Sequence, residues 1–69
     1  MPSSVIKQAF YRPDEAVLDI LFTTGRRYLY HDVPAGEAER FTAAFSNGRY
    51  FNAHIRDRYA FSEVATAPT

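Results

Sequence analysis

The feature that most constrains this chain is the absence of cysteine from a sequence of only 69 residues. A domain of about 60 residues buries only about 60% of the surface that its unfolded chain exposes. Without disulfide bonds, such a chain depends on large apolar side chains to stabilise its core. Six phenylalanines and five tyrosines supply them, and each ring buries roughly 150–250 Å². We therefore expect one domain with an aromatic core.

The charges of the chain balance. Eight lysines and arginines offset eight aspartates and glutamates, so the formal net charge is +0. This excludes a globally basic nucleic-acid binder but allows a local basic patch. No apolar run approaches the roughly 18 residues of a membrane span, and the start, Met-Pro-Ser-Ser, lacks the apolar segment of a secretion signal. We expect a cytoplasmic protein that does not contact a membrane.

Alternating apolar and polar residues predict three strands, over Val5–Tyr11, Ala16–Thr23 and Arg26–Val33. In the second segment, one of the two alternating sets of residues is entirely apolar and defines the face toward the core: Ala16, Leu18, Ile20 and Phe22. Short turns separate the segments, at Arg12–Glu15 and at Thr24-Gly25. Short links between successive strands favour antiparallel hairpins, so we expect a three-stranded meander.

Helical spacing follows the third strand. Pro34 suits a first helical turn, and Ala35–Phe45 shows apolar residues three and four apart. A shorter helix is predicted over Arg49–Arg56, with Asn47 as its cap. The segment Arg58–Val64 is compatible with a short edge strand or with an extended arm. We expect these residues to form one core: Leu18, Ile20, Phe22, Phe41, Phe45, Phe51 and Ile55.

These expectations combine into an α+β fold. A three-stranded antiparallel β-meander is followed by one longer and one short α-helix packed on one sheet face, and by a short extended C-terminal arm. The predicted domain covers residues 3–64, and residues 1–2 and 65–69 are expected to be frayed termini.

An ordered set of short motifs runs through the chain. It consists of Tyr28-Leu29-Tyr30, then Val33-Pro34, then a helix, then Ser46-Asn47-Gly48-Arg49-Tyr50-Phe51-Asn52. In this order and spacing, the chain resembles the KTSC domain family from about residue 3 to about residue 61. Members occur at the C-terminus of some lysyl-tRNA synthetases and as stand-alone small bacterial proteins.

The resemblance brings no established enzymatic activity with it, and the attachment to a tRNA synthetase suggests RNA as a ligand. Many members of the family have a basic residue between the two tyrosines, whereas this chain has Leu29. A phosphate contact made by that basic residue would be missing here.

A local basic patch is present near the C-terminus, where residues 40–58 contain four arginines and a single aspartate. In the predicted second helix, Arg49, Asn52 and Arg56 share the face opposite the core residues. Arginine forks suit phosphate groups, and an adjacent ring can stack on a base. We therefore predict weak binding of RNA or another single-stranded nucleic acid through Arg49, Tyr50, Asn52, Arg56 and Arg58. The alternative is a solvated face whose arginines pair with Glu37, Glu39 or Glu63.

Two further features keep alternatives open. Tyr28 and Tyr30 share one strand face, where they form either a stacking platform for bases or rings that cover the helices; packing is favoured. The other sheet face is expected to expose Val17, Leu21 and Leu29. The alternative function is therefore protein interaction or self-association through this exposed face or a sheet edge.

No catalytic residues, cofactor or metal site are predicted. The chain has neither a glycine-rich phosphate loop nor a cysteine nucleophile. His31 and Asp32 are adjacent on a predicted strand and so point to opposite faces, and the only other histidine is His54. The prediction is a small binding module that is not an enzyme.

Overall fold

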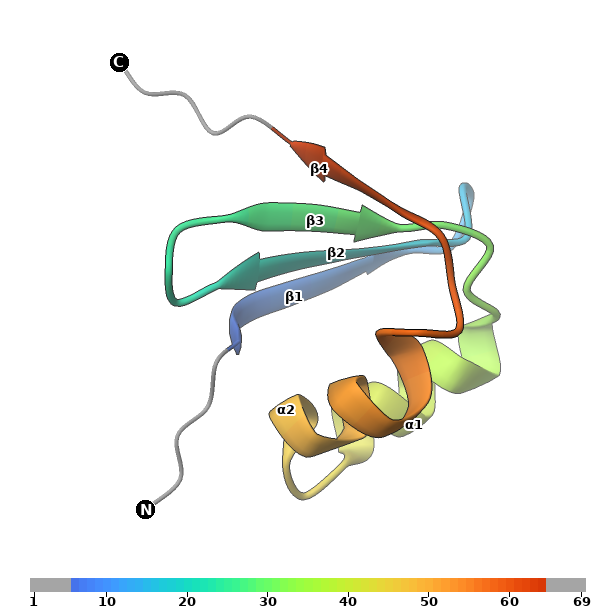
Figure 1. The fold of residues 1–69 in the computed structure, drawn as a ribbon. Coiled ribbons are helices and arrows are strands. Elements are labelled where there is room, and N and C mark those ends of the chain that lie inside the picture. The colour runs from blue at the N-terminus through green and yellow to red at the C-terminus, as the bar shows by residue number, and fades with distance from the viewer. Residues whose placement is uncertain (1–5, 65–69) are drawn as a thin grey trace.

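The computed structural model describes residues 6–64 of the chain. It confirms the α+β class. Four antiparallel strands form one sheet in chain order: β1 (Ile6–Arg12), β2 (Val17–Phe22), β3 (Arg27–Tyr30) and β4 (Phe61–Val64). The helical elements lie together below the sheet in Figure 1: α1 (Ala35–Ala43), α2 (Asn47–Tyr50) and the π-helix η1 (Phe51–Ile55). Val5 and the termini predicted to be frayed, residues 1–2 and 65–69, lie outside the described residues.

The first three strands follow the predicted meander, with shorter bounds. Strand β2 starts at Val17 because Ala16 has a φ of 57°, which places it in the preceding turn. Strand β3 stops at Tyr30, and Asp32 has a φ of 59°, so the chain leaves the sheet before Val33. Positive φ is uncommon for residues with a side chain and interrupts extended structure.

The sheet has four strands, which corrects the prediction of three strands and an arm. Phe61 pairs with Tyr30, and Glu63 pairs with Tyr28, in an antiparallel register. The His31 backbone N–H donates to the Ala60 carbonyl at 2.9 Å, which extends the pairing beyond the strand. The C-terminal segment becomes a strand because β3 offers it an unpaired edge, and its own short pattern cannot reveal that edge.

The core lies between the sheet and the helices. Five residues predicted to be in the core are buried there, namely Leu18, Ile20, Phe41, Phe51 and Ile55. Tyr30 and Val33 are buried in the same cluster. Phe22 is partly buried against this cluster. Phe45 is fully exposed, so its predicted place in the core is wrong. Helix α1 ends at Ala43 and Ala44 is extended, so Phe45 no longer follows the helical spacing.

The second helix starts earlier than predicted and changes type. Ser46 is its N-cap, and the Ser46 side chain accepts a hydrogen bond from the Arg49 backbone N–H at 3.3 Å. Asn47 does not cap this helix. Its side-chain amide donates to the Phe41 carbonyl at 2.7 Å and thereby satisfies a carbonyl of α1. The chain then continues as η1, in which the Arg56 N–H donates to the Phe51 carbonyl.

Candidate functional site

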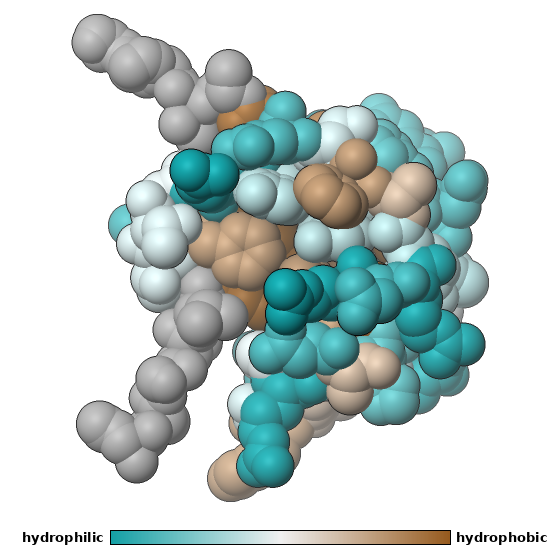
Figure 2. Space-filling view, in the orientation of Figure 1, coloured by the Kyte–Doolittle hydropathy of each residue, from teal (hydrophilic) through white to brown (hydrophobic). Residues whose placement is uncertain are grey.

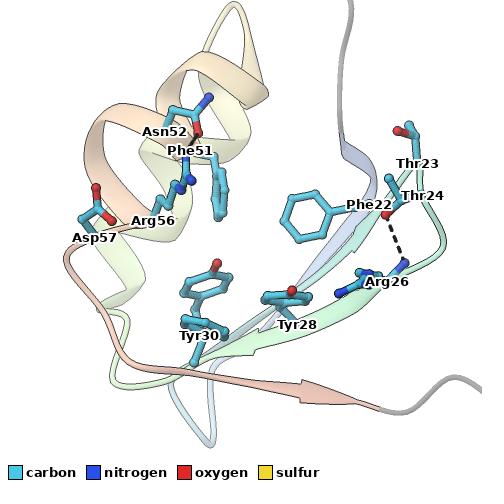
Figure 3. Close-up of a pocket in the computed structure, with 11 residues that line it drawn as sticks. Phe22, Thr23, Thr24, Arg26, Tyr28, Tyr30, Phe51, Asn52, Arg56 and Asp57 are labelled. Carbon is cyan, nitrogen blue, oxygen red and sulfur yellow. Dashed lines mark hydrogen bonds between the residues drawn. The ribbon is translucent and has the colours of Figure 1, made fainter.

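An open groove of about 680 Å³ lies between the inner face of the sheet and η1 (Figure 3). Five aromatic residues line it: Phe22, Tyr28, Tyr30, Phe51 and Phe61. Its polar lining consists of Thr23, Thr24, Arg26, Asn52, Arg56 and Asp57. The space-filling view shows hydrophobic surface where the sheet meets the helices, bordered by hydrophilic side chains (Figure 2). The groove therefore combines an aromatic interior with a polar rim.

Three rings on the inner face of the sheet form a compact cluster, in which Tyr30 and Phe61 are 5.4 Å apart and tilted by 34°. The Tyr28 ring is 5.1 Å from the Phe61 ring at 17°, and 6.4 Å from the Tyr30 ring at 21°. Two further rings meet this cluster edge-on, namely Phe22 against Tyr28 at 83° and Phe51 against Tyr30 at 81°. Aromatic faces carry negative partial charge and edges carry positive charge, so these contacts are favourable. Tyr28, Tyr30 and Phe61 therefore form a ring cluster that Phe22 and Phe51 meet edge-on.

Strand alternation and strand pairing bring these rings together. Tyr28 and Tyr30 are two residues apart on β3, so both point to the helix side of the sheet. The β3–β4 register places Phe61 opposite Tyr30. Tyr30 is 3% exposed, Tyr28 is half-buried and Phe61 is 52% exposed. The ring cluster therefore extends from the core to the solvent.

The polar rim is weakly positive. Arg26 and Arg56 line the groove together with a single carboxylate, Asp57. Arg56 donates from Nη1 to Oδ1 of Asn52 at 3.4 Å, which joins the two residues on the helix side (Figure 3). Arg26 lies 3.7 Å from a carboxylate oxygen of Glu63, and both side chains are well exposed. Such an exposed ion pair is weak, so Arg26 can leave Glu63 and bind another anion.

The hydroxyl of Tyr30 remains protonated at neutral pH. Burial is the largest cause that raises the pKa of Tyr30 above its ordinary value, and the nearby Tyr28 raises it further. Arg56 lowers this pKa, but to a smaller extent. The buried part of the groove is therefore neutral and able to donate a hydrogen bond.

The structure separates the five predicted nucleic-acid-binding residues. Asn52 and Arg56 line the groove. Arg49 and Arg58 are exposed and lie outside its lining. The alternative of glutamate pairing holds for Arg40, which lies 3.5 Å from Glu37. Within residues 6–64, Arg49, Arg56 and Arg58 are exposed and form no ion pair.

Tyr50 lies outside the groove, in a polar cluster around Glu37. Its hydroxyl donates to Oε2 of Glu37 at 2.6 Å and accepts from Nε of Arg40 at 3.3 Å. Its ring lies 4.4 Å from the His54 ring, and the Tyr59 hydroxyl donates to Glu37 at 3.3 Å. The Tyr50 hydrogen bond is the largest cause that lowers the pKa of Glu37, and burial opposes it. This tyrosine is therefore engaged in holding α1 to α2.

Sequence reasoning left most of the groove unrecognised. Phe22 and Phe51 were expected only as core residues, and Arg26 and Phe61 had no assigned role. The alternation of Tyr28 and Tyr30 was the one available signal. It allowed a stacking platform for bases or a packing role. The structure confirms the packing role, and the two rings also line the groove.

The chemistry of the groove consists of stacking, hydrogen bonding and attraction of anions. Among residues 6–64, no group of three or more histidine, cysteine, aspartate or glutamate side chains is arranged to hold a metal ion. None of the helices in this range has the length and apolar character needed to cross a membrane.

Comparison with known proteins places this fold in a family. A protein of Tsukamurella paurometabola is 40% identical over 57 residues, which cover 83% of this chain and 85% of that protein. A protein of Stutzerimonas stutzeri is 33% identical over 52 residues, which cover 75% of this chain and 73% of that protein.

A solved structure and a family model both match the chain to the same domain. The crystal structure of a KTSC domain protein from Yersinia pestis matches with a TM-score of 0.83 and 32% identity, over 93% of this chain and 90% of that one. The family model for the KTSC domain matches residues 2–59. The chain therefore belongs to the KTSC domain family.

Proposed function

We propose that this protein is a small non-catalytic module of the cytoplasm that binds single-stranded RNA in the aromatic groove between β3, β4 and η1. The observation that carries the proposal is the ring cluster of Tyr28, Tyr30 and Phe61, which lines the same groove as two arginines. Ring faces and guanidinium groups are the two components with which proteins bind single strands.

The rings support binding of bases. Tyr28 is half-buried and Phe61 is half-exposed, so each has surface that an unpaired base can cover. Stacking on an aromatic side chain contributes about 1–3 kcal/mol per base and tolerates any base. Because only these two rings of the cluster are accessible, we expect the groove to bind one or two bases with little sequence preference.

The arginines support binding of the RNA backbone. Arg26 and Arg56 come from opposite walls of the groove, and each presents several N–H donors. Two neutralised phosphates on a single strand give a log–log salt slope of about −1.4. We expect weak affinity that is largely lost by a few hundred millimolar salt.

The neutral Leu29 does not weaken this proposal. Leu29 pairs with Asp19, and both lie on the sheet face opposite the groove. A basic residue at this position would not reach the groove from there. The lost phosphate contact that the family resemblance suggests therefore concerns another surface.

Fluorescence anisotropy with a labelled ten-nucleotide single-stranded RNA at low salt tests the proposal. We expect Arg56→Glu to abolish measurable binding, because it reverses a charge at the rim and leaves the core untouched. Tyr28→Leu keeps an apolar side chain in place but removes the stacking face. It is expected to weaken binding about five- to a hundredfold, which corresponds to about 1–3 kcal/mol.

Arg49→Glu is the matched control, because Arg49 is exposed on the same helical segment but lies outside the groove. We expect this variant to lose at most a few-fold in affinity. Circular dichroism checks that all variants are folded. Equal loss in Arg49→Glu and Arg56→Glu would locate binding on the helix surface instead of the groove, and no binding by the parent protein would reject the RNA function.

A further inference from the structure

The sheet face that the helices leave open has a charged centre. Asp19 sits in the middle of β2, with Phe10 of β1 and Leu29 of β3 directly opposite it on the neighbouring strands. Arg12 and Arg27 reach Asp19 from the two diagonal positions. This surface, formed by Phe10, Arg12, Asp19, Leu21, Arg27 and Leu29, is called the open face below.

The carboxylate at the centre is fully engaged. Arg12 donates from Nη2 to Oδ2 of Asp19 at 2.9 Å, and Arg27 donates from Nε to Oδ1 at 2.9 Å and from Nη2 to Oδ2 at 2.5 Å. The Asp19 side chain is only 5% exposed. The two arginines hold the pKa of Asp19 below its usual range, so it stays charged at neutral pH. Asp19 is therefore a fixed internal acceptor and is not available to a ligand.

Both arginines retain N–H donors that form no hydrogen bond within the protein. Their side chains are 40% and 41% exposed, and two guanidinium groups share one carboxylate. Among the described residues, the Nη1 groups of Arg12 and Arg27 form no hydrogen bond and are the donors left for a ligand. The Nε of Arg12 also has no acceptor, but it is buried and out of a ligand's reach. The centre of the open face thus carries a net positive charge with donors in excess of acceptors.

A hollow lies beside this centre. It has a volume of about 390 Å³, and its lining includes the carboxylate that the arginines already bind. The lining residues are Gln8, Ala9, Phe10, Arg12, Asp19, Leu21 and Arg27. Phe10 is 64% exposed, and the Arg12 guanidinium lies 5.9 Å from its ring centroid. The hollow therefore offers apolar surface directly next to cationic groups. Val17 was expected to contribute to an exposed patch here, but it is 6% exposed and does not.

We propose that the open face binds an extended acidic segment of a partner protein, with one side-chain carboxylate on Arg12 and Arg27 and an apolar side chain beside Phe10. Alternate residues of an extended segment point the same way, roughly 7 Å apart. A carboxylate followed two residues later by an apolar side chain can place the first on the arginines and the second against Phe10, which line the same hollow. Guanidinium groups bind carboxylates through paired hydrogen bonds.

Charge favours this occupant over two others. A second copy of the chain would place four arginines against one another with only two aspartates between them. RNA would bring several phosphates to a centre whose positive charge is already half neutralised by Asp19. A single carboxylate with apolar neighbours fits both the net charge and the exposed phenylalanine.

The test uses the whole protein and a fluorescein-labelled peptide, Ser-Gly-Asp-Ser-Phe-Ser-Asp-Gly-Ser, with an amidated C-terminus. We expect measurable binding below about 1 mM and at least tenfold weaker binding of the same peptide with both aspartates replaced by asparagine. Arg12→Gln leaves the Arg27 fork on Asp19 and is expected to stay folded. This variant and Phe10→Ser are each expected to weaken binding about tenfold.

Matched controls are available within the chain. Phe45→Ser replaces a fully exposed phenylalanine outside the open face, and Arg49→Gln replaces an exposed arginine outside it. Both are expected to change peptide affinity less than twofold. The proposal is overturned if the parent does not bind the peptide, if the asparagine peptide binds equally, or if the controls match the test variants.

Two further measurements distinguish the other occupants. Sedimentation of the parent that shows a dimer, lost in Phe10→Ser, would assign the open face to a second copy. Loss of RNA binding in Arg12→Gln would assign it to nucleic acid. Either result overturns the acidic-peptide proposal. A dimer would leave the RNA proposal for the groove untouched, whereas loss of RNA binding in Arg12→Gln would also count against the groove, whose own test variant is Arg56→Glu.

Discussion

The two faces of strand β2 bury their side chains by different means. Toward the helices, Leu18 and Ile20 are 1% and 0% exposed and lie in the apolar core. Toward the open side, Asp19 is 4% exposed but is covered by the two arginines that bind it. The same alternating strand is thus stabilised by packing on one face and by charged hydrogen bonds on the other. Alternation assigns a residue to a face, whereas its neighbours across the sheet decide how that face is stabilised.

The packed face should respond most strongly to truncation. We expect Phe41→Ala to reduce the free energy of unfolding by roughly 3–5 kcal/mol, because the Phe41 side chain is 2% exposed and lies at the centre of the core. A chain of this size is near the lower end of the usual 5–15 kcal/mol range, so the variant should be marginally folded at 25 °C. Urea or thermal denaturation followed by circular dichroism measures the change.

Phe45→Ala is the control for this comparison, because Phe45 is fully exposed. Its effect should be within about 0.5 kcal/mol. If both variants melted alike, the core assignment of Phe41 would be wrong.

The open face should respond less strongly. We expect Asp19→Ala to cost about 1–3 kcal/mol, because it leaves two guanidinium groups without their acceptor while both remain able to reach water. Asp14→Ala in the exposed β1–β2 turn serves as a matched control and should be nearly neutral. Urea denaturation of both variants gives the difference. A loss for Asp19→Ala as large as that for Phe41→Ala would mean that the two faces contribute equally.

Acid should weaken the charged interactions and spare the packed ones. Hydrogen bonds from Arg27 lower the pKa of Asp19, and the hydrogen bond from Tyr50 lowers that of Glu37. Since each pKa is lower in the folded state, the unfolded chain takes up protons first as the pH falls. Stability should be constant above about pH 5 and decline progressively below about pH 4.

Melting temperatures between pH 7 and pH 3 measure this decline. In the variant Asp19→Asn the melting temperature should fall less steeply below pH 4, because one of the two carboxylates whose pKa is lowered by folding is gone. An unchanged slope would show that Asp19 has the same pKa in the folded and unfolded states.

The smallest expected effect is the difference in stability between two variants that each remove a tyrosine hydroxyl from Glu37. Tyr50→Phe removes a hydrogen bond of 2.6 Å to Glu37, and Tyr59→Phe removes one of 3.3 Å. We expect a loss of about 1 kcal/mol for the first and of about 0.5 kcal/mol or less for the second. Urea denaturation resolves the order, and the reverse order would show that Tyr59 is the main partner of Glu37.

The candidate site was predictable only in part. Asn52 and Arg56 follow from helical spacing and do line the groove. Tyr50 has the same local signal, yet its hydroxyl meets Glu37, thirteen residues earlier in the chain. A stacking role and a packing role look identical in the sequence around Tyr50. The partner that distinguishes them comes from another helix.

The sequence alone determined the α+β class, the three strands of the meander and five residues of the core, because alternation and helical spacing are local properties of the chain. The tertiary structure decided the fourth strand, since Phe61–Val64 becomes extended by pairing with the edge of β3. It also decided that Phe45 lies outside the core and that Asp19 is buried. The fourth strand depends on pairing between segments far apart in the chain, and the burial of Asp19 depends on arginines of the two neighbouring strands. Phe45 is exposed because the chain leaves the helical conformation at Ala44. Alternation and helical spacing reveal neither the pairing nor the residue at which a helix ends.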